Sequence, residues 1–208
     1  MLEQDVSSPI NLKEIEHARE WERTAMQRPF REEFFSAFYR ELESLQFSNP
    51  QTGTLTILEL GSGPGFLAEY LLARLPNIQM TLLDNSSAMH KLAEIRLKQH
   101  SKRVGFVERD FKDPGWNEGL NQFDAVLTLQ AVHELRHKQH ATTLHRQVRP
   151  LLGPNGIYLY CDHYFGEGAM HNNQLYMSLS EQRQSLESAR FQYKEVLIKG
   201  GRALYNAN

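Results

Sequence analysis

The chain has 208 residues, a formal net charge of −2 at pH 7 and one cysteine. This length is typical of one domain with a short extension, the near-neutral charge without a basic run disfavours nucleic acid as a partner, and no window approaches the roughly 18 consecutive apolar residues of a membrane span. The single cysteine, Cys161, excludes an internal disulfide, and residues 1–14 lack the apolar run of a signal peptide, so we expect a cytoplasmic protein that acts on small molecules or proteins.

The first part of the chain, residues 11–47, has helical patterning. It contains a cluster of aromatic residues, which are Trp21, Phe30, Phe34, Phe35, Phe38 and Tyr39. Such a cluster is more often the packing stripe of a helix than a cage around a substrate. We therefore predict an N-terminal helical extension over residues 1–50, ahead of a main domain over residues 51–208.

From about residue 53, short apolar runs alternate with amphipathic segments, which is the pattern of a doubly wound α/β sheet. The expected parallel strands are 54–60, 79–84, 103–110, 123–129 and 156–162. The expected helices between them are 66–75, 87–100 and 140–152, and the last is closed by Gly153, Pro154 and Gly156.

The end of the chain changes character. A helix-like run over 173–190 precedes two β-rich runs, 191–199 and 202–207, which flank Gly200 and Gly201. Both glycines can take the positive φ of a tight hairpin turn. We therefore predict that the parallel sheet ends in an antiparallel hairpin.

A glycine-rich loop, ELGSGPGF, joins the first expected strand to the first helix. Its glycines let a ligand approach backbone N–H groups at the helix N-terminus. A dinucleotide-binding loop needs a small residue three positions after Gly63, where this chain has Phe66, so NAD is disfavoured.

Two aspartates follow at the ends of the next strands. Asp84 is positioned to accept hydrogen bonds from both hydroxyls of a ribose, and Asp110 from the amine of an adenine, with Met89 or Phe111 against the ring. Either aspartate alone is more often a helix cap or a turn residue. Together with the glycine loop, these strand ends predict one nucleoside site.

The motifs ELGSGPG, DNSSAM, ERDF and FDAVLTLQAVHEL resemble the successive motifs of class I S-adenosylmethionine-dependent methyltransferases. The resemblance covers roughly residues 53–208. It implies a Rossmann-like fold with a mostly parallel seven-stranded sheet, S-adenosylmethionine as cofactor, and methyl transfer to an O, N or C acceptor on a small molecule. It also implies the cofactor-binding residues Glu59, Gly61, Gly63, Gly65, Asp84, Met89, Asp110, Phe111 and Gln130, the last near the sulfonium.

The stretch HELRH, residues 133–137, matches the H-E-x-x-H pattern of zinc metalloproteases, in which both histidines share one face of a helix. The resemblance instead implies that His133 lies in the loop after the fourth strand, and that His137 is a partly exposed residue near the start of the next helix. The downstream H-x-x-G-x-x-H extension is missing, and the next acidic residue, Asp162, belongs to a strand. We therefore expect no metal; a zinc hydrolase and a non-catalytic S-adenosylmethionine-binding module are the alternatives.

His133 and His163 are the candidate bases. His133 borders the expected acceptor pocket, and His163 follows the fifth strand at the same edge of the sheet. Because a sulfonium already activates its methyl group, the protein mainly positions the acceptor and, for a protonated acceptor, supplies a base. Loop packing or helix capping is the commoner role for either histidine. The N-terminal segment and residues 163–179 are the expected walls of this pocket.

Overall fold

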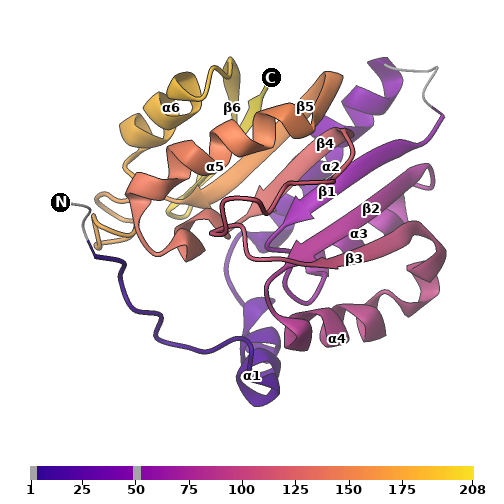
Figure 1. The fold of residues 1–208 in the computed structure, drawn as a ribbon, viewed down its shortest axis with the longest axis horizontal. Coiled ribbons are helices and arrows are strands. Elements are labelled where there is room, and N and C mark those ends of the chain that lie inside the picture. Colours follow the sequence, from indigo (N-terminus) through magenta and orange to yellow (C-terminus); the bar gives the residue numbers. More distant parts are fainter. Residues whose placement is uncertain (1–3, 49–52) are drawn as a thin grey trace.

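A computed structural model describes residues 4–48 and 53–208, so the predicted boundary between residues 50 and 51 lies outside the described residues. One seven-stranded sheet runs through the molecule in the order β3-β2-β1-β4-β5-β7-β6 (Figure 1). Its strands are Leu55–Leu60 (β1), Ile78–Asp84 (β2), Val104–Glu108 (β3), Phe123–Leu129 (β4), Leu152–His163 (β5), Tyr193–Lys199 (β6) and Arg202–Ala207 (β7).

The first five strands are parallel, and β7 pairs antiparallel with both β5 and β6. Gly200 and Gly201, with φ of 53° and 73°, form the turn between β6 and β7. A residue with a side chain adopts this left-handed backbone only with strain. The predicted mostly parallel sheet with a terminal antiparallel hairpin is confirmed.

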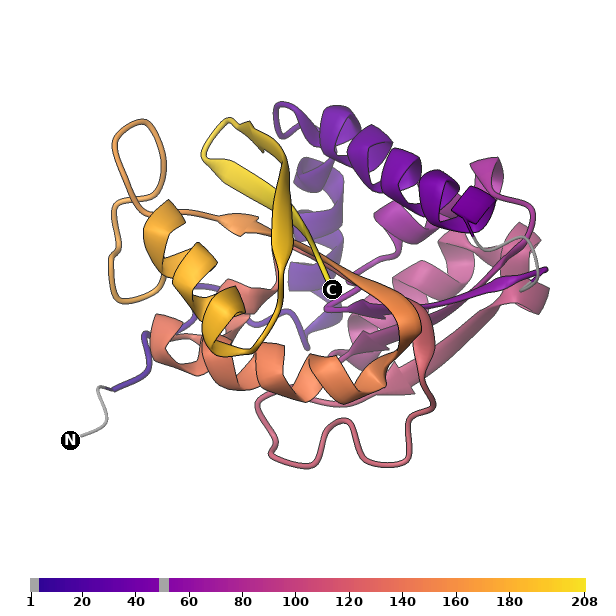
Figure 2. The same cartoon turned by 90° about the horizontal axis from the view of Figure 1, so that it is seen from above.

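Helices cover both faces of the sheet (Figure 2). One face carries Arg31–Ser48 (α2), Phe66–Arg74 (α3) and Ser87–Arg96 (α4), and the other carries Ala141–Val148 (α5) and Leu179–Ser188 (α6). This division follows from right-handed crossovers, because the chain moves outward from β1 in opposite directions along the two halves of the sheet.

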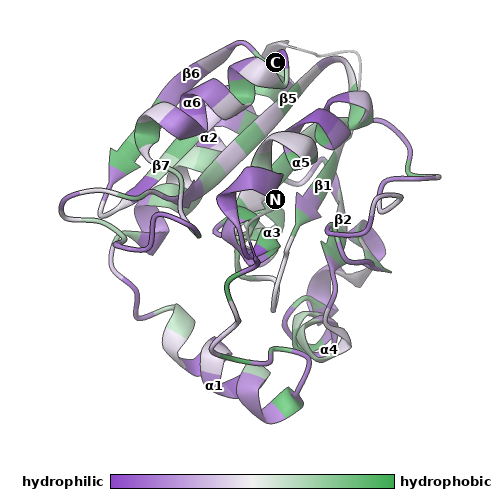
Figure 3. Ribbon diagram, turned by 60° about the vertical axis from the view of Figure 1, so that its left-hand side comes forward, coloured by the Kyte–Doolittle hydropathy of each residue, from purple (hydrophilic) through white to green (hydrophobic). Residues whose placement is uncertain are grey.

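Two hydrophobic cores result, one on each face. Ile57 belongs to the core under α2 and α3, whereas its neighbour Leu58 belongs to the core under α5 and α6. Successive side chains of a strand point to opposite faces, so a strand buried on both sides is apolar throughout. Hydrophobic residues accordingly lie along the strands (Figure 3).

The predicted helical extension forms two helices, Ile15–Ala25 (α1) and α2. They are separated at Phe30, which has a φ of 63°. The aromatic cluster divides as well: Phe34, Phe35 and Phe38 are fully buried against the sheet, while Phe30 remains exposed. In this part of the chain, most aromatic residues are a packing stripe.

Two predicted helix ends, residues 100 and 152, are wrong, because α4 ends at Arg96 and α5 at Val148 and a 3-10 turn follows each. Two predicted starts are wrong as well. β5 begins at Leu152 and not at residue 156, because its register against β4 shifts and Gly153 to Gly156 bulge between Leu152 and Ile157. The last helix begins at Leu179 and not at residue 173, because Ser178 and Glu181 form a capping box that fixes its start. Within residues 4–48 and 53–208, no helix is long and apolar enough to cross a membrane.

Candidate active site

A cavity of about 680 Å³ opens at the C-terminal edge of the parallel strands. It is lined by eight of the nine predicted cofactor residues and by both candidate bases. The exception is Gly65, the N-cap of α3, where an added Cβ would lie 3.1 Å from Leu97 and 3.3 Å from Ala93. Gly65 therefore allows α3 and α4 to pack closely and does not face the cavity.

The glycine loop after β1 is fixed by backbone contacts. Gly61 and Ser62 donate to the carbonyl of Leu83 at 2.8 and 3.2 Å. Gly61 has a φ of 64°, and a Cβ there would lie 2.4 Å from the Cβ of Ala131. Only glycine fits this position, and the loop backbone forms a wall of the cavity.

Asp84 connects this loop to α4. Its carboxylate accepts from the backbone N–H of Gly63 at 2.8 Å and from that of Ser86 at 2.9 Å. Burial raises the pKa of Asp84, while these two hydrogen bonds oppose the shift. The carboxylate is therefore an acceptor at the cavity wall whose position is fixed by two backbone donors.

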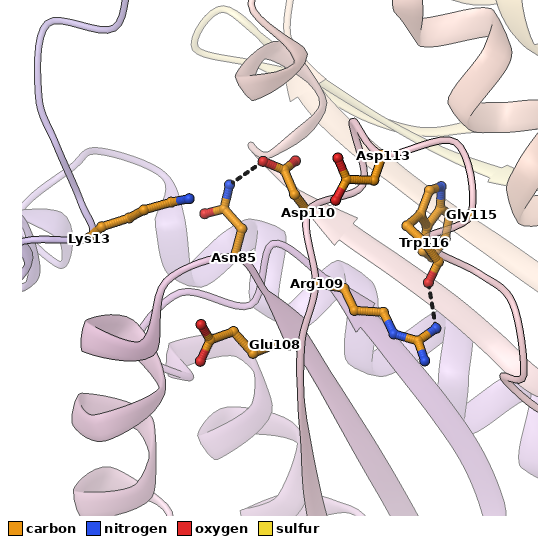
Figure 4. Close-up of a pocket in the computed structure, with 8 residues that line it drawn as sticks. All are labelled: Lys13, Asn85, Glu108, Arg109, Asp110, Asp113, Gly115 and Trp116. Atoms are coloured by element: carbon orange, nitrogen blue, oxygen red, sulfur yellow. Dashed lines mark hydrogen bonds between the residues drawn. The ribbon is translucent and has the colours of Figure 1, made fainter.

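Asp110 lies where the main cavity meets a second, shallower one of about 360 Å³. It accepts from the Asn85 side chain and from the Lys112 backbone, both at 2.9 Å. Figure 4 shows Lys13 pointing toward Asn85, while Arg109 turns away to the carbonyl of Trp116. We call the wall formed by the glycine loop, Asp84 and Asp110 the cofactor end of the cavity.

The opposite wall, formed by Gln130, His133, His163 and Tyr176, we call the acceptor end. Asp162, which is 2% exposed, organises it. Its carboxylate lies 2.7 Å from Nδ1 of His133 and accepts from the backbone N–H groups of His133 and His163. The other ring nitrogen, Nε2, faces the Glu134 carboxylate at 3.4 Å, so both ring nitrogens of His133 lie beside a carboxylate.

The two histidines differ in protonation. Burial alone would lower the pKa of His133, but the carboxylates of Asp162 and Glu134 together outweigh it and raise that pKa to about 10. Burial lowers the pKa of His163 to about 4, and the positive charge of His133 adds to this effect. At neutral pH, one ring is therefore charged and its neighbour neutral.

Gln130 lies beside the neutral ring. Its side-chain nitrogen is 2.5 Å from Nε2 of His163, and its backbone N–H donates to the carbonyl of Cys161. The residue has a left-handed φ of 57°, which is uncommon for a side-chain-bearing residue. Gln130 directly follows the end of β4, so its left-handed backbone turns the chain away from the strand at the cavity wall.

Three cavity residues outside the predicted set come from α1, α2 and the link between them, and they are Trp21, Arg31 and Arg28. Arg31 is 8% exposed, and its Nε has no hydrogen-bond partner in the described chain. Glu59, at the end of β1, is 3% exposed and has one similarly unpartnered oxygen. Burial raises the pKa of Glu59 to about 8. The sequence signal that could have indicated Arg31 is its position just before the buried aromatic residues of α2.

HELRH does not form one helix. His133 lies in the 3-10 turn Val132–Leu135, and His137 precedes the next turn, Lys138–His140, with Arg136 at a φ of 67° between them. Among residues 4–48 and 53–208, no three His, Cys, Asp or Glu side chains are arranged to hold a metal ion. The expectation that His137 is partly exposed is wrong, since it is 3% exposed and its Nδ1 accepts from the backbone N–H of Gln139.

Residues 4–13, which we call the N-terminal strap, run past the C-terminal ends of the parallel strands toward α1 (Figure 1). Arg136 binds the strap near its start, donating to the carbonyls of Val6 and Ser7 at 2.9 and 2.7 Å. Ser86 binds it near its end, donating to the carbonyl of Leu12 at 2.6 Å. The strap therefore crosses both ends of the cavity.

Comparison with known proteins gives a family match. Residues 57–156 match the family model described as a methyltransferase domain, and no curated protein matches the chain. Among solved structures, the CurJ carbon methyltransferase has a TM-score of 0.64 at 15% identity, over 78% of this chain and 50% of its own. An O-methyltransferase family protein from Burkholderia thailandensis has a TM-score of 0.65 at 17% identity, over 84% and 58%. The DhpI-SAH complex has a TM-score of 0.64 at 17% identity, over 94% and 95%.

The chain thus spans about half the length of the first two of these structures. At such low identity the structural likeness shows the fold, and the family match adds the type of domain. Both the predicted Rossmann-like fold and the predicted methyltransferase domain are confirmed.

Proposed function

Because the chain carries a class I S-adenosylmethionine-dependent methyltransferase domain, we propose that it transfers the methyl group of S-adenosylmethionine to an O, N or C atom of a small molecule. The observation that carries the proposal is that the glycine loop, Asp84 and Asp110 line one cavity together with His133 and His163. A cytoplasmic location is part of the same proposal.

The chemistry of the cofactor end suits S-adenosylmethionine. In our proposal the loop from Glu59 to Gly63 surrounds the methionine part, Asp84 accepts from the ribose, and Asp110 accepts from the adenine. The unpartnered buried oxygen of Glu59 suits an ammonium group, and the unpartnered Nε of Arg31 suits a carboxylate. An amino acid moiety supplies both of these partners.

Met89 and Phe111 line the same end and are proposed to contact the adenine ring, while Gln130 is proposed to lie near the sulfonium. S-adenosylmethionine supplies an activated methyl group, so the chain has to exclude water and align the acceptor. The strap, bound at Ser86 and Arg136, suits the first of these tasks.

His133 and His163 are proposed to act on the acceptor. His133 holds a proton at neutral pH, so it serves as a base only after losing that proton, and its Nε2 reaches an acceptor only if that acceptor competes with Glu134. His163 is neutral, but its Nε2 lies beside the Gln130 amide. Proton removal therefore needs either deprotonation of His133 or displacement of Gln130.

The proposal is tested by binding and by turnover. S-adenosylhomocysteine should raise the melting temperature, because a ligand that binds only the folded state stabilises it, whereas NAD should not. Transfer of a labelled methyl group across a metabolite panel then separates an enzyme from a non-catalytic binding module. Equal stabilisation by NAD, or stoichiometric zinc in the purified protein, would contradict the proposal.

A further inference from the structure

Arg28 carries an unpaired positive charge in the cavity wall. It lies in the link between α1 and α2, and its guanidinium carbon is 4.9 Å from the centre of the Trp21 ring. In the described part of the chain, no carboxylate forms an ion pair with Arg28, and no acceptor takes a hydrogen bond from its guanidinium. Burial lowers its pKa, yet a guanidinium keeps its proton at neutral pH.

Other cations surround this position. Arg31 lines the same wall, and Arg202, behind it, has a buried Nε without a partner among the described residues. The charges of Arg28 and Arg202 both help to lower the pKa of Arg31. Glu59 has a raised pKa of about 8, which leaves it a weak counter-charge at pH 7. Glu134 also lines the cavity, but its carboxylate already pairs with His133 and Arg136. The wall is therefore positive when the cavity holds no ligand.

The proposed cofactor neutralises one of these arginines. S-adenosylmethionine has a single carboxylate, and Arg31 interacts electrostatically with Glu59 at the start of the glycine loop, where the methionine part is proposed to lie. Arg28 interacts with Arg31 as well, but it also interacts with Tyr176 and His163 at the acceptor end. Once the cofactor is bound, Arg28 still lacks an anion.

We propose that the methyl acceptor is an anion, and that Arg28 binds its carboxylate or phosphoryl group. The planar guanidinium fork matches two oxygens of either group, which gives orientation as well as affinity. The Tyr176 hydroxyl is a further donor at the same end, whereas both ring nitrogens of His133 already face carboxylates. This inference rests on the proposed function, since it names the substrate class of that site.

The test uses the full chain saturated with S-adenosylhomocysteine and three probes of one ring size: benzoate, phenylphosphonate and neutral benzamide. Calorimetry or ligand-observed NMR should show an anion binding at least about tenfold more tightly than benzamide, as expected for hydrogen bonds to a charged group. The preferred anion distinguishes a carboxylate from a phosphoryl acceptor. Arg28→Gln should abolish the preference, and Arg28→Lys should retain part of it.

The matched control is Arg74→Gln. Arg74 also stacks on an aromatic ring, 3.6 Å from the centre of Tyr70, but does not line the cavity, so this variant should keep the preference for anions. Three results would overturn the inference: benzamide binding as tightly as the anions, an anion preference that survives Arg28→Gln, or no anion binding to the saturated protein.

Cofactor affinity, measured first, keeps the two proposals apart. If S-adenosylhomocysteine does not bind the wild-type chain, the proposed function fails. If it binds and the anions do not discriminate, only the inference fails. Arg28→Gln should leave that affinity within about threefold, and a tenfold loss would assign Arg28 to the cofactor carboxylate and overturn the inference.

Discussion

The two ends of the cavity are built in different ways. The cofactor end comes from consecutive strand ends between Glu59 and Phe111, whereas the acceptor end combines Gln130, His133, His163 and Tyr176, and is completed by Arg28 from the N-terminal extension. Parallel strands bring their carboxyl ends to one edge of a sheet, so topology alone assembles the cofactor end. The acceptor end needs contacts between distant segments, and this allows its chemistry to vary on a constant scaffold.

Removing a charged side chain from the acceptor end should give the largest effect. We expect His133→Ala, measured near pH 10 where His133 loses its proton, to reduce turnover of a protonated acceptor by about 10²- to 10⁴-fold, the usual contribution of a general base, with cofactor affinity retained. Initial rates with labelled S-adenosylmethionine measure the first quantity and calorimetry the second. His163→Ala is the paired variant, and a larger loss there would transfer the role of base to His163.

The corresponding change at the cofactor end should affect binding. We expect Asp84→Asn to weaken S-adenosylhomocysteine by about ten- to a hundredfold, because Asp84 is a charged acceptor and also fixes Gly63 and Ser86. Calorimetry measures this change. Asp124→Asn is the control: Asp124 accepts from Thr56 on β1, does not line the cavity, and should leave the affinity unaltered.

The pH dependence should also belong to the acceptor end. With the pKa of His133 raised to about 10, base catalysis should rise up to about tenfold per unit between pH 7 and 10. The stability supplied by the pairing of His133 with Asp162 changes with pH in the opposite direction. It is fully present below the ordinary histidine pKa of about 6.5 and is lost as pH rises through about 10. A rate profile that is flat in wild type and in His133→Gln would show that His133 only positions the acceptor.

The smallest effect on the site should come from His137, which lies outside the cavity. His137→Ala should leave cofactor affinity and turnover nearly unchanged. Because the side chain is 3% exposed, we expect a loss of about 1 kcal/mol or more in unfolding free energy, measured by denaturant titration. Zinc bound stoichiometrically and lost together in His133→Ala and His137→Ala would contradict the separation of the two residues.

The same contrast explains what the sequence could predict. Strand alternation and glycine turns are local signals, and they gave all seven strands, with only β5 displaced at its start by a bulge at Gly153. Asp84 could be found because it ends β2, and Asp110 because it follows β3 by two residues. Arg28 and the pairing of His133 with Asp162 have no such signal, since each depends on how α1, α2 or the loop after β4 folds back onto the sheet.

The strap has a kinetic consequence. Because it is held at Ser86 and at Arg136, exchange of one cofactor molecule for the next requires breaking hydrogen bonds that no reacting atom touches. We expect such a doubly anchored cover to impose an order, in which the cofactor enters first and its demethylated product leaves last. The residence time of that product, and not methyl transfer, can then determine how many turnovers one molecule completes in a second.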